Sequence, residues 1–319
     1  MLEAPLLGEL SPKDVKFSQW RRETDLFTGF LAAAIDEKEF HPWRDRFKLW
    51  HQNAQRCGTL LGFRKTKDNE LKLNSANFCK HRLCPMCAKR RSHIWGAKIS
   101  EILPKIPEIK LQNCIFLTLT VRNFPISQLA NQKIWLSNSI KRLIQSLRDR
   151  GTILGYIKGF EITRPQNSFN ECHPHYHIMI AMTSEYFDRF YIEQQEWRSR
   201  WQRAARLDYD PWVRVRKVSN IKSGILETIK YELKPENYVS SWLWTARLAI
   251  ANKGTQRVSY GGIFREHLRF LKYDPQDLIH ECDNELNYSS GGEGKRYMFK
   301  WDAKLKHHIY HRTEKISIL

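Results

Sequence analysis

The chain has 319 residues, with 53 Lys and Arg against 34 Asp and Glu, so its formal net charge is +19. A hydrophobic content of 41% and an aromatic content of 12% are typical of a globular protein and exclude a disordered one. No run approaches the ~18 consecutive apolar residues of a membrane-spanning helix, and the N-terminal stretch lacks the apolar region of a signal peptide. A balance this basic indicates a polyanionic partner, nucleic acid before an anionic membrane surface.

Residues 1–50 are mixed and charged. Apolar side chains at helical spacing predict a helical N-terminal extension here, and they are Leu26, Phe27, Phe30, Leu31 and Ala34. The extension itself indicates no function.

Residues 51–100 form a cysteine-rich segment. Its four cysteines are Cys57, Cys79, Cys84 and Cys87. Four thiolates at this spacing predict a structural zinc site, in which Pro85 presets a tight turn within the close Cys-x-x-Cys pair. His81 is a further candidate ligand, and a redox Cys-x-x-Cys pair or buried free thiols are the alternatives. Seven cysteines in all, four of them in metal-like spacing, favour a reducing compartment over a disulfide framework.

Basic side chains flank these cysteines. Their composition predicts a phosphate-binding cluster made of Lys80, Arg82, Lys89, Arg90 and Arg91. The segment is therefore interpreted as a zinc-stabilised basic knuckle.

Two strands and a helix are predicted next. Residues 114–121 (CIFLTLTV) are rich in β-branched and aromatic residues, with Thr at alternate positions, which predicts a strand. Residues 127–150 carry an apolar stripe at helical spacing. Residues 155–163 (GYIKGFEIT) predict a further strand, in which Glu161 is the one acid; the alternative is a carboxylate on the wet face of the sheet.

His175 and His177 lie at the start of an apolar strand. Alternate side chains of a strand share a face and lie about 6.7 Å apart. Two imidazoles projecting together supply two ligands of a metal site. If this strand pairs with 155–163, Glu161 is the carboxylate ligand that Mg²⁺ or Mn²⁺ prefers. His173 is the competing third ligand, and two unrelated surface histidines are the alternative.

Residues 184–207 predict a basic helix in which Trp197 and Trp201 are core anchors rather than base-stacking platforms. Residues 213–218 (VRVRKV) alternate apolar and basic side chains, as a half-exposed strand does. Arg214 and Arg216 would then face one side together, available to nucleic acid or simply solvated.

Residues 225–234 predict a helix that Pro235 ends. Glu227, Tyr231 and Lys234 share one of its faces. A phenol can attack phosphorus and leave a covalent phosphotyrosine, an ammonium can neutralise phosphate charge, and a carboxylate can position or deprotonate water. An ordinary amphipathic helix is the alternative. A further apolar helix is predicted at 240–253, and residues 274–319 are predicted to be a linker and a basic C-terminal tail.

The ordered set of these motifs resembles the replication initiators of rolling-circle plasmids, a single-tyrosine branch of the HUH endonucleases. The motifs are FLTLT at 116–120, His175-Tyr176-His177, and Glu227, Tyr231 and Lys234 on one helix, preceded by Cys79, Cys84 and Cys87. The match runs over roughly residues 50–270. It implies an α+β fold: an HUH-endonuclease-like central antiparallel sheet flanked by helices, with the zinc knuckle as an insertion and residues 101–273 as the nicking and joining domain.

The resemblance also implies the reaction. Tyr231 would attack a scissile phosphate of single-stranded or hairpin origin DNA, with Mn²⁺ or Mg²⁺ bound by the histidine pair and Zn²⁺ bound by the cysteines. Glu227 would direct water when replication ends, and Tyr238 is the rival nucleophile. The implied partners are origin DNA, the host helicase and polymerase, and no membrane, in the bacterial cytoplasm. The alternatives are an HUH transposase or relaxase, and a non-catalytic zinc-dependent DNA-binding regulator. A net charge of +19 argues against a hydrolase of small phosphoesters.

Overall fold

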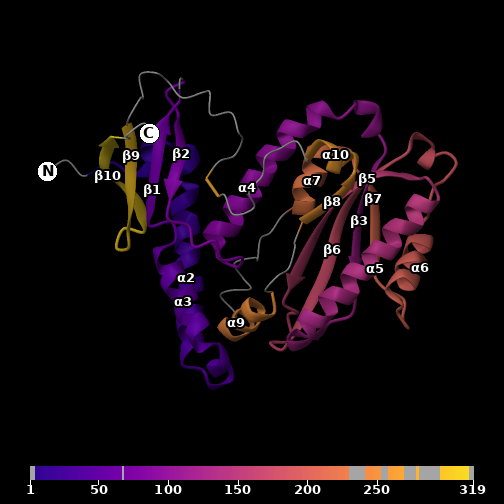
Figure 1. Ribbon diagram of the computed structural model, residues 1–319, viewed down its shortest axis with the longest axis horizontal. Helices are drawn as coiled ribbons and strands as arrows, with labels where there is room; N and C mark the ends of the chain where they lie inside the picture. The colour runs from indigo at the N-terminus through magenta and orange to yellow at the C-terminus, as the bar shows by residue number, and fades with distance from the viewer. Residues whose placement is uncertain are drawn as a thin grey trace. The chain divides into compact units, whose positions relative to one another are not determined.

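The computed structural model describes residues 4–66, 68–229, 241–252, 258–268, 278–279 and 295–315. Over these ranges the chain combines helices with antiparallel sheets, which confirms the predicted α+β class (Figure 1). Chain contacts divide it into two compact units. We call Met1–Ile94, Glu232–Ala246 and Tyr273–Leu319 the cysteine unit, and Trp95–Tyr231 with Arg247–Lys272 the histidine unit. No helix in the described ranges is long and apolar enough to cross a membrane.

The cysteine unit packs helices against a four-stranded antiparallel sheet in the order β10-β9-β1-β2. The elements are α1 (Leu7–Leu10), α2 (Lys16–Ile35), α3 (Arg44–Arg56), the first part of α4 (Pro85–Ile102), β1 (Leu60–Lys65), β2 (Leu71–Ala76), β9 (Lys295–Asp302) and β10 (His307–Lys315). Phe17 of α2 contacts Phe63 of β1, which contacts Phe299 of β9, each ring edge to face. These aromatic contacts join the helical layer to the sheet.

Strands β9 and β10 lie in a region for which the sequence predicted only a linker and a basic tail. They form an antiparallel hairpin, and β9 pairs with β1. In β9, Phe299 is fully buried while the neighbouring Lys300 is exposed. Aromatic residues alternate at Tyr297, Phe299 and Trp301, but Met298 between them is also buried, so the period-2 burial of a half-buried strand is incomplete here.

The histidine unit contains a sheet in the order β7-β3-β6-β5-β8, with the short β4 paired to β6. The strands are β3 (Cys114–Thr120), β4 (Phe124–Pro125), β5 (Ile153–Thr163), β6 (Glu171–Met182), β7 (Val213–Lys217) and β8 (Val258–Gly262). The predicted strands at 114–121, 155–163 and 213–218 are confirmed. Strand β6, which carries the histidines, lies in the middle of the sheet, as the resemblance implied.

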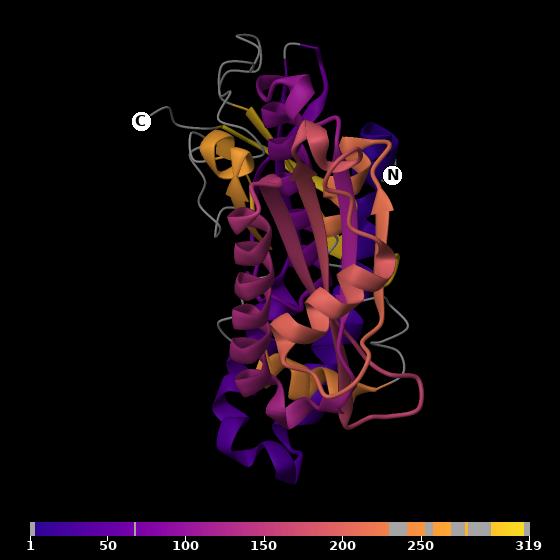
Figure 2. The same ribbon diagram turned by 90° about the vertical axis from the view of Figure 1, so that its right-hand side faces the viewer.

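Helices cover the two faces of this sheet. They are α5 (Leu129–Asp149), α6 (Gln194–Ala205), α7 (Ile221–Ile229) and α10 (Ile263–Leu268), whereas α9 (Trp242–Ala251) contributes residues to both units. Helices α5 and α6 run across one face (Figure 2), where Trp197 and Trp201 are fully buried as predicted. Helix α7 packs on the opposite face, against Gly159 of β5 and Met179 of β6. The face under α7 is the one that carries the histidine pair.

Short 3₁₀ turns connect these elements. They are Pro12–Asp14, Lys38–Trp43, Leu103–Lys105, Glu108–Lys110, Ile126–Gln128 and Ser184–Tyr186. The last of these replaces the start of the helix predicted at 184–207, so α6 begins only at Gln194.

Candidate functional site

Strand register brings Glu161, His175 and His177 together. Strand β5 pairs with β6 so that Glu161 lies opposite His175 and Gly159 lies opposite His177. The Nε2 atoms of His175 and His177 are 2.8 and 2.9 Å from the same oxygen, Oε2 of Glu161. One ligand atom from each of the three residues lies within 4.8 Å of the others. The arrangement is a convergent set of two nitrogens and one oxygen.

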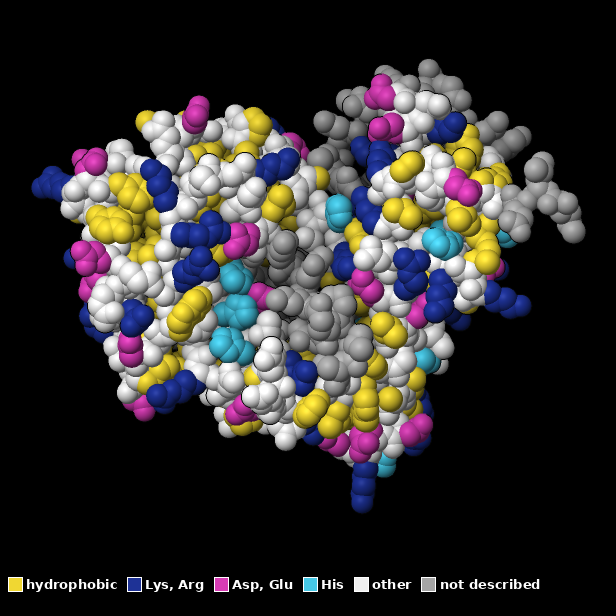
Figure 3. Space-filling model, turned by 180° about the vertical axis from the view of Figure 1, so that it is seen from behind, with side chains coloured by type: hydrophobic (Ala, Val, Ile, Leu, Met, Phe, Trp, Pro, Cys, Tyr) yellow, Lys and Arg dark blue, Asp and Glu magenta, His cyan; other side chains and the backbone are white. Residues whose placement is uncertain are grey.

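The electrostatics favour a bound cation. Burial acts to raise the pKa of the Glu161 carboxyl, but the hydrogen bonds from His175 and His177 outweigh it and lower this pKa to about 2. Glu161 is therefore a carboxylate at neutral pH. The side chains of Glu161, His175 and His177 are 25, 14 and 20% exposed, so a solvent ion can reach them. Figure 3 shows a group of histidines at the surface, with Lys and Arg side chains nearby.

A threonine hydroxyl contacts the ring of one of the two histidines. Oγ1 of Thr118, on the neighbouring strand β3, lies 3.3 Å from Nδ1 of His177. A hydroxyl can accept from or donate to this nitrogen, so it suits either tautomer of the ring. Nδ1 of His175 is buried and has no hydrogen-bond partner among the described residues. The sequence marked Thr as alternating in this strand but did not assign Thr118 to the site.

The donor set fits a hard divalent cation. Two imidazoles and one carboxylate leave coordination positions open for water or phosphate oxygens, and Mn²⁺ or Mg²⁺ accepts such ligands. His173, the competing third ligand in the sequence, lies outside this group. It is half-buried, and its Nδ1 lies 2.8 Å from Oδ1 of Asn123.

Helix α7 lies against the same face of the sheet, next to the metal-ligand set. A Cβ atom added to Gly159 would lie 1.8 Å from the backbone oxygen of Thr228, so only glycine permits this approach. Glu227, the neighbour of Thr228, forms an ion pair with Arg216 of β7. The Arg216 guanidinium lies 4.6 Å from the centre of the Phe116 ring.

The other predicted catalytic residues follow α7 in the sequence. Tyr231, Lys234 and the rival Tyr238 lie outside the described residues. Arg214, predicted to contact DNA, is exposed on β7 and pairs in register with Thr118.

In the cysteine unit, Cys57, Cys79, Cys84 and Cys87 converge. The sulfur of Cys57 is 3.5 Å from that of Cys87 and 3.6 Å from that of Cys84, and Cys79 is 3.6 Å from Cys87. Four thiolates about 2.3 Å from a tetrahedral zinc would have sulfurs roughly 3.8 Å apart. All four are free, since a disulfide would bring two sulfurs to about 2.05 Å. His81 is not in this group and packs between Phe27 and Trp50.

The thiols also need a cation to ionise together. Hydrogen bonding with neighbouring thiols, Cys79 first, raises the pKa of Cys57 well above its ordinary value, and burial does the same for Cys87. A divalent ion removes this penalty because it stabilises every thiolate at once. The four residues therefore fit a structural zinc ion.

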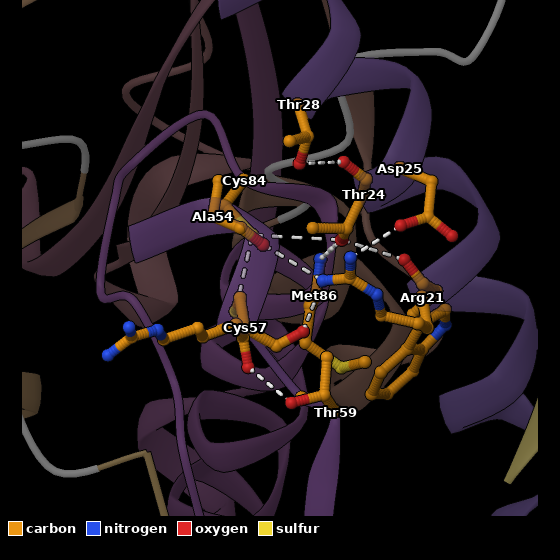
Figure 4. Close-up of polar contacts among 12 residues, drawn as sticks. Arg21, Thr24, Asp25, Thr28, Ala54, Cys57, Thr59, Cys84 and Met86 are labelled. Atoms are coloured by element: carbon orange, nitrogen blue, oxygen red, sulfur yellow. Dashed lines mark hydrogen bonds and ion pairs between the residues drawn. The ribbon is translucent and has the colours of Figure 1, made fainter. Parts of the chain in front are cut away.

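Backbone around the cysteines is fixed by α2 (Figure 4). The Arg21 guanidinium donates to the carbonyl oxygens of Ala54 and Cys57, at 2.9 and 2.6 Å. The Thr24 hydroxyl accepts from the Met86 amide at 3.1 Å. Pro85 is the first residue of α4, so the close cysteine pair flanks a helix start rather than an isolated turn.

The basic residues that flank the cysteines fall into two groups, one that pairs within the protein and one that is more exposed. Arg90 is 2% exposed and donates to the carbonyl oxygens of Leu278 and Ile279, and Lys89 pairs with Glu23 at 2.8 Å. The sequence had grouped both with the phosphate-binding cations. Lys80 and Arg82 are exposed, and Arg91, half-buried, donates to the Lys80 carbonyl.

Comparison with known proteins gives the family. A family described as Replication protein matches residues 70–310. The chain is 31% identical over 262 residues to Protein rep of Streptococcus pneumoniae, covering 75% of this chain and 78% of that protein. It is 32% identical to Protein rep of Bacillus amyloliquefaciens (81% and 84% covered) and 29% identical to that of Lactiplantibacillus plantarum (82% and 92%). No solved structure matches the chain. The chain therefore belongs to the replication-protein family, the initiators of plasmid rolling-circle replication.

Proposed function

We propose that this replication initiator nicks and rejoins one strand of its plasmid origin by metal-dependent transesterification through a covalent 5′-phosphotyrosine. The observation that carries the proposal is the convergence of Glu161, His175 and His177 next to α7. The described part of α7 ends at Ile229, two residues before Tyr231. A strand fixes the metal ligands, and the adjoining helix leads to the nucleophile.

Glu161, His175 and His177 would hold Mn²⁺ or Mg²⁺. When bound, the ion supplies Lewis-acid polarisation of the scissile phosphate. The chain's own residues orient the reacting groups: the Thr118 hydroxyl holds the His177 ring, and the Gly159–Thr228 contact fixes α7. Positioning of this kind accounts for much of catalysis in phosphoryl transfer.

In the nicking step, the Tyr231 oxygen forms a bond to phosphorus and the bond from phosphorus to the 3′ oxygen breaks. The phenol proton leaves, and the departing 3′ oxygen gains a proton to become the 3′-OH primer. We assign Lys234 to neutralising phosphate charge. An unperturbed phenol has a pKa of about 10, which a neighbouring cation lowers.

Glu227 is proposed to direct water in the terminating step. It forms an ion pair with Arg216, which engages one of its carboxylate oxygens. A DNA phosphate that attracts Arg216 would release Glu227 for this role. The exposed Arg214 would contact the same strand.

The cysteine unit is proposed to bind Zn²⁺ and to present Lys80, Arg82 and Arg91 to origin DNA. Single-stranded or hairpin origin DNA is the proposed substrate, and the host helicase and polymerase are the proposed partners. Free cysteines at the zinc site suit the reducing bacterial cytoplasm.

The test uses a labelled single-stranded oligonucleotide that carries the plasmid's own origin, with Mn²⁺. The wild type should form an SDS-resistant adduct that needs the ion, Tyr231→Phe should form none, and the matched control Tyr238→Phe should retain it. An adduct that survives Tyr231→Phe would place the nucleophile elsewhere. Zinc-dependent DNA binding without any adduct would support a non-catalytic regulator instead. Transfer without replication, on a transposon end or transfer origin, would support a transposase or relaxase.

A further inference from the structure

Trp212 is the most exposed of the eleven tryptophans, all of which lie in the described residues. Its exposed fraction is 54%, and the next most exposed, Trp43, has 38%. Tryptophan side chains are highly buried on average. No stacked aromatic or cation partner is found for the Trp212 ring within the part of the chain that the structure describes.

The backbone of Trp212 is fixed to the end of strand β3. Its carbonyl oxygen accepts hydrogen bonds from the amide and the hydroxyl of Thr120, at 3.3 and 3.0 Å. Thr120 in turn pairs with His175, and His175 pairs with Glu161. Trp212, Thr120, His175 and Glu161 therefore form one row across the sheet. Two strand spacings place the Trp212 backbone about 10 Å from that of His175.

Alternation places the indole on the face of the metal-ligand set. Val213, the first residue of β7, is 2% exposed, and Val215 also lies on that side of the strand, held at its amide by Gln194 of α6. Side chains on either side of Val213 project to the opposite face. Trp212 and Arg214 thus share the face of Thr118, His175 and His177.

The segment that carries Trp212 is preorganised. The Tyr209 hydroxyl accepts from the Arg122 amide at 2.8 Å, and the Arg122 guanidinium stacks on the Tyr209 ring at 3.9 Å. The Trp201 indole donates to the Thr120 carbonyl at 2.8 Å. Little order therefore has to be gained when a ligand covers the exposed ring, which favours binding.

The charge around the ring suits a polyanion. Strand β7 lies at the edge of the sheet and carries Arg214 and Arg216 on the same face as Trp212. A flat aromatic surface beside two guanidinium groups is the combination that binds single-stranded nucleic acid, in which cations contact phosphates and rings stack on bases. A base inside a duplex is already stacked on its neighbours, so such a surface selects unpaired DNA.

We propose that Trp212 is a stacking platform for an unpaired base of origin DNA close to the scissile phosphate. The inference rests on the proposed function, because that function places single-stranded DNA at the neighbouring metal-ligand set. Trp212 holds the strand in register along β7 and takes no part in bond making or breaking. The platform thereby distinguishes the extruded single strand from duplex DNA.

The first experiment measures binding of labelled oligodeoxythymidylate to the full chain without added Mn²⁺. Trp212→Leu, which keeps apolar bulk without the ring, should weaken binding roughly 5- to 150-fold, since one stacked base contributes this much. Trp212→Phe should retain most of the affinity. The matched control is Trp43→Leu, the other exposed tryptophan, which should bind as the wild type does. Equal affinity of Trp212→Leu and wild type would overturn the proposal.

The second experiment moves a single abasic site along the origin oligonucleotide. For the wild type, removing the base at one position should lower the affinity. Trp212→Leu has already lost this contribution, so the same abasic site should not lower the affinity of this variant further. Full additivity at every position would refute stacking of a base on Trp212. Additivity is also the result expected if Trp212 contacts a protein partner instead. Adduct formation by the wild type on the same oligonucleotide tests the proposed function separately: no adduct, with the abasic coupling intact, would reject catalysis and keep the platform.

Discussion

Gly159→Ala should separate DNA binding from cleavage. Gly159 of β5 pairs with His177 of β6, and the Cα hydrogen of Gly159 faces the backbone of α7. A methyl group at this position would lie 1.8 Å from the Thr228 carbonyl oxygen, whereas real Cβ contacts are not found under 3.0 Å. The helix must therefore move away from the sheet by at least 1.2 Å, the difference between the two distances.

The magnitude follows from this displacement. Helix α7 carries Glu227 and is followed in the sequence by the proposed nucleophile Tyr231, so the proposed function predicts that the shift slows cleavage. A misplacement of about 1 Å costs roughly 100-fold in rate when catalysis depends on positioning. The overpacked contact should also lower the free energy of unfolding by roughly 1–3 kcal/mol. The metal-ligand set and the Trp212 ring take no part in the contact between Gly159 and Thr228 and should be unaffected.

The assay measures single-turnover adduct formation and oligonucleotide affinity for the same preparation. We expect Gly159→Ala to form the adduct about 100-fold more slowly, with the affinity for DNA and for Mn²⁺ unchanged. The control is Gly29→Ala on α2, where an added Cβ meets no atom within 4 Å. That variant should be neutral or slightly stabilised, because alanine favours a helix. A wild-type cleavage rate in Gly159→Ala would refute the inferred contact between α7 and the sheet.

Three further outcomes are expected. Thr118→Val, which removes the hydroxyl at His177 Nδ1, should weaken Mn²⁺ binding roughly 10-fold, and Thr118→Ser should restore it; equal affinities by titration calorimetry would contradict the orienting role. Cys84→Ser or a zinc chelator should release about one zinc per chain and lower the unfolding temperature, which metal analysis and calorimetry check; an unchanged zinc content would reject the four-cysteine site. Burial lowers the pKa of His308 from 6.5 to about 4, so its contribution to stability is complete above pH 6.5 and is lost as the pH falls towards 4. A full loss amounts to roughly 3 kcal/mol, which urea unfolding at several pH values measures. His308→Gln should flatten this pH dependence, and His311→Gln, a change at an exposed residue, should leave it as in the wild type. Identical pH profiles for the wild type and both variants would contradict the stability contribution assigned to His308.

Local sequence patterns were sufficient for the main elements. The period-2 alternation of β6 places His175 and His177 on one face whatever the rest of the chain does, since a strand fixes that geometry through its own backbone. The apolar stripe of α5 likewise required only helical spacing. The Cys-x-x-Cys spacing of Cys84 and Cys87 indicated a metal site because it is also local.

Pairing between distant segments decided the rest. Glu161 joins the histidines through the register of β5 against β6, and a slip of one residue would turn it to the other face. Cys57 meets the other cysteines through chain packing in which α2 also takes part, since Arg21 donates to the Cys57 carbonyl oxygen. Strand β9 completes a sheet with β1, more than two hundred residues earlier in the chain.

Trp212 shows most clearly what the sequence pattern does not determine. Its place in the sequence, before an alternating strand, does not distinguish a buried anchor such as Trp201 from an exposed ring. Only the hydrogen bonds of its carbonyl to Thr120 align it with His175. The sequence by itself determined which residues can share a strand or a helix face, because those relations depend on local backbone geometry. Tertiary structure decided which faces meet, because that depends on burying apolar surface and pairing backbone groups that lie far apart in the chain.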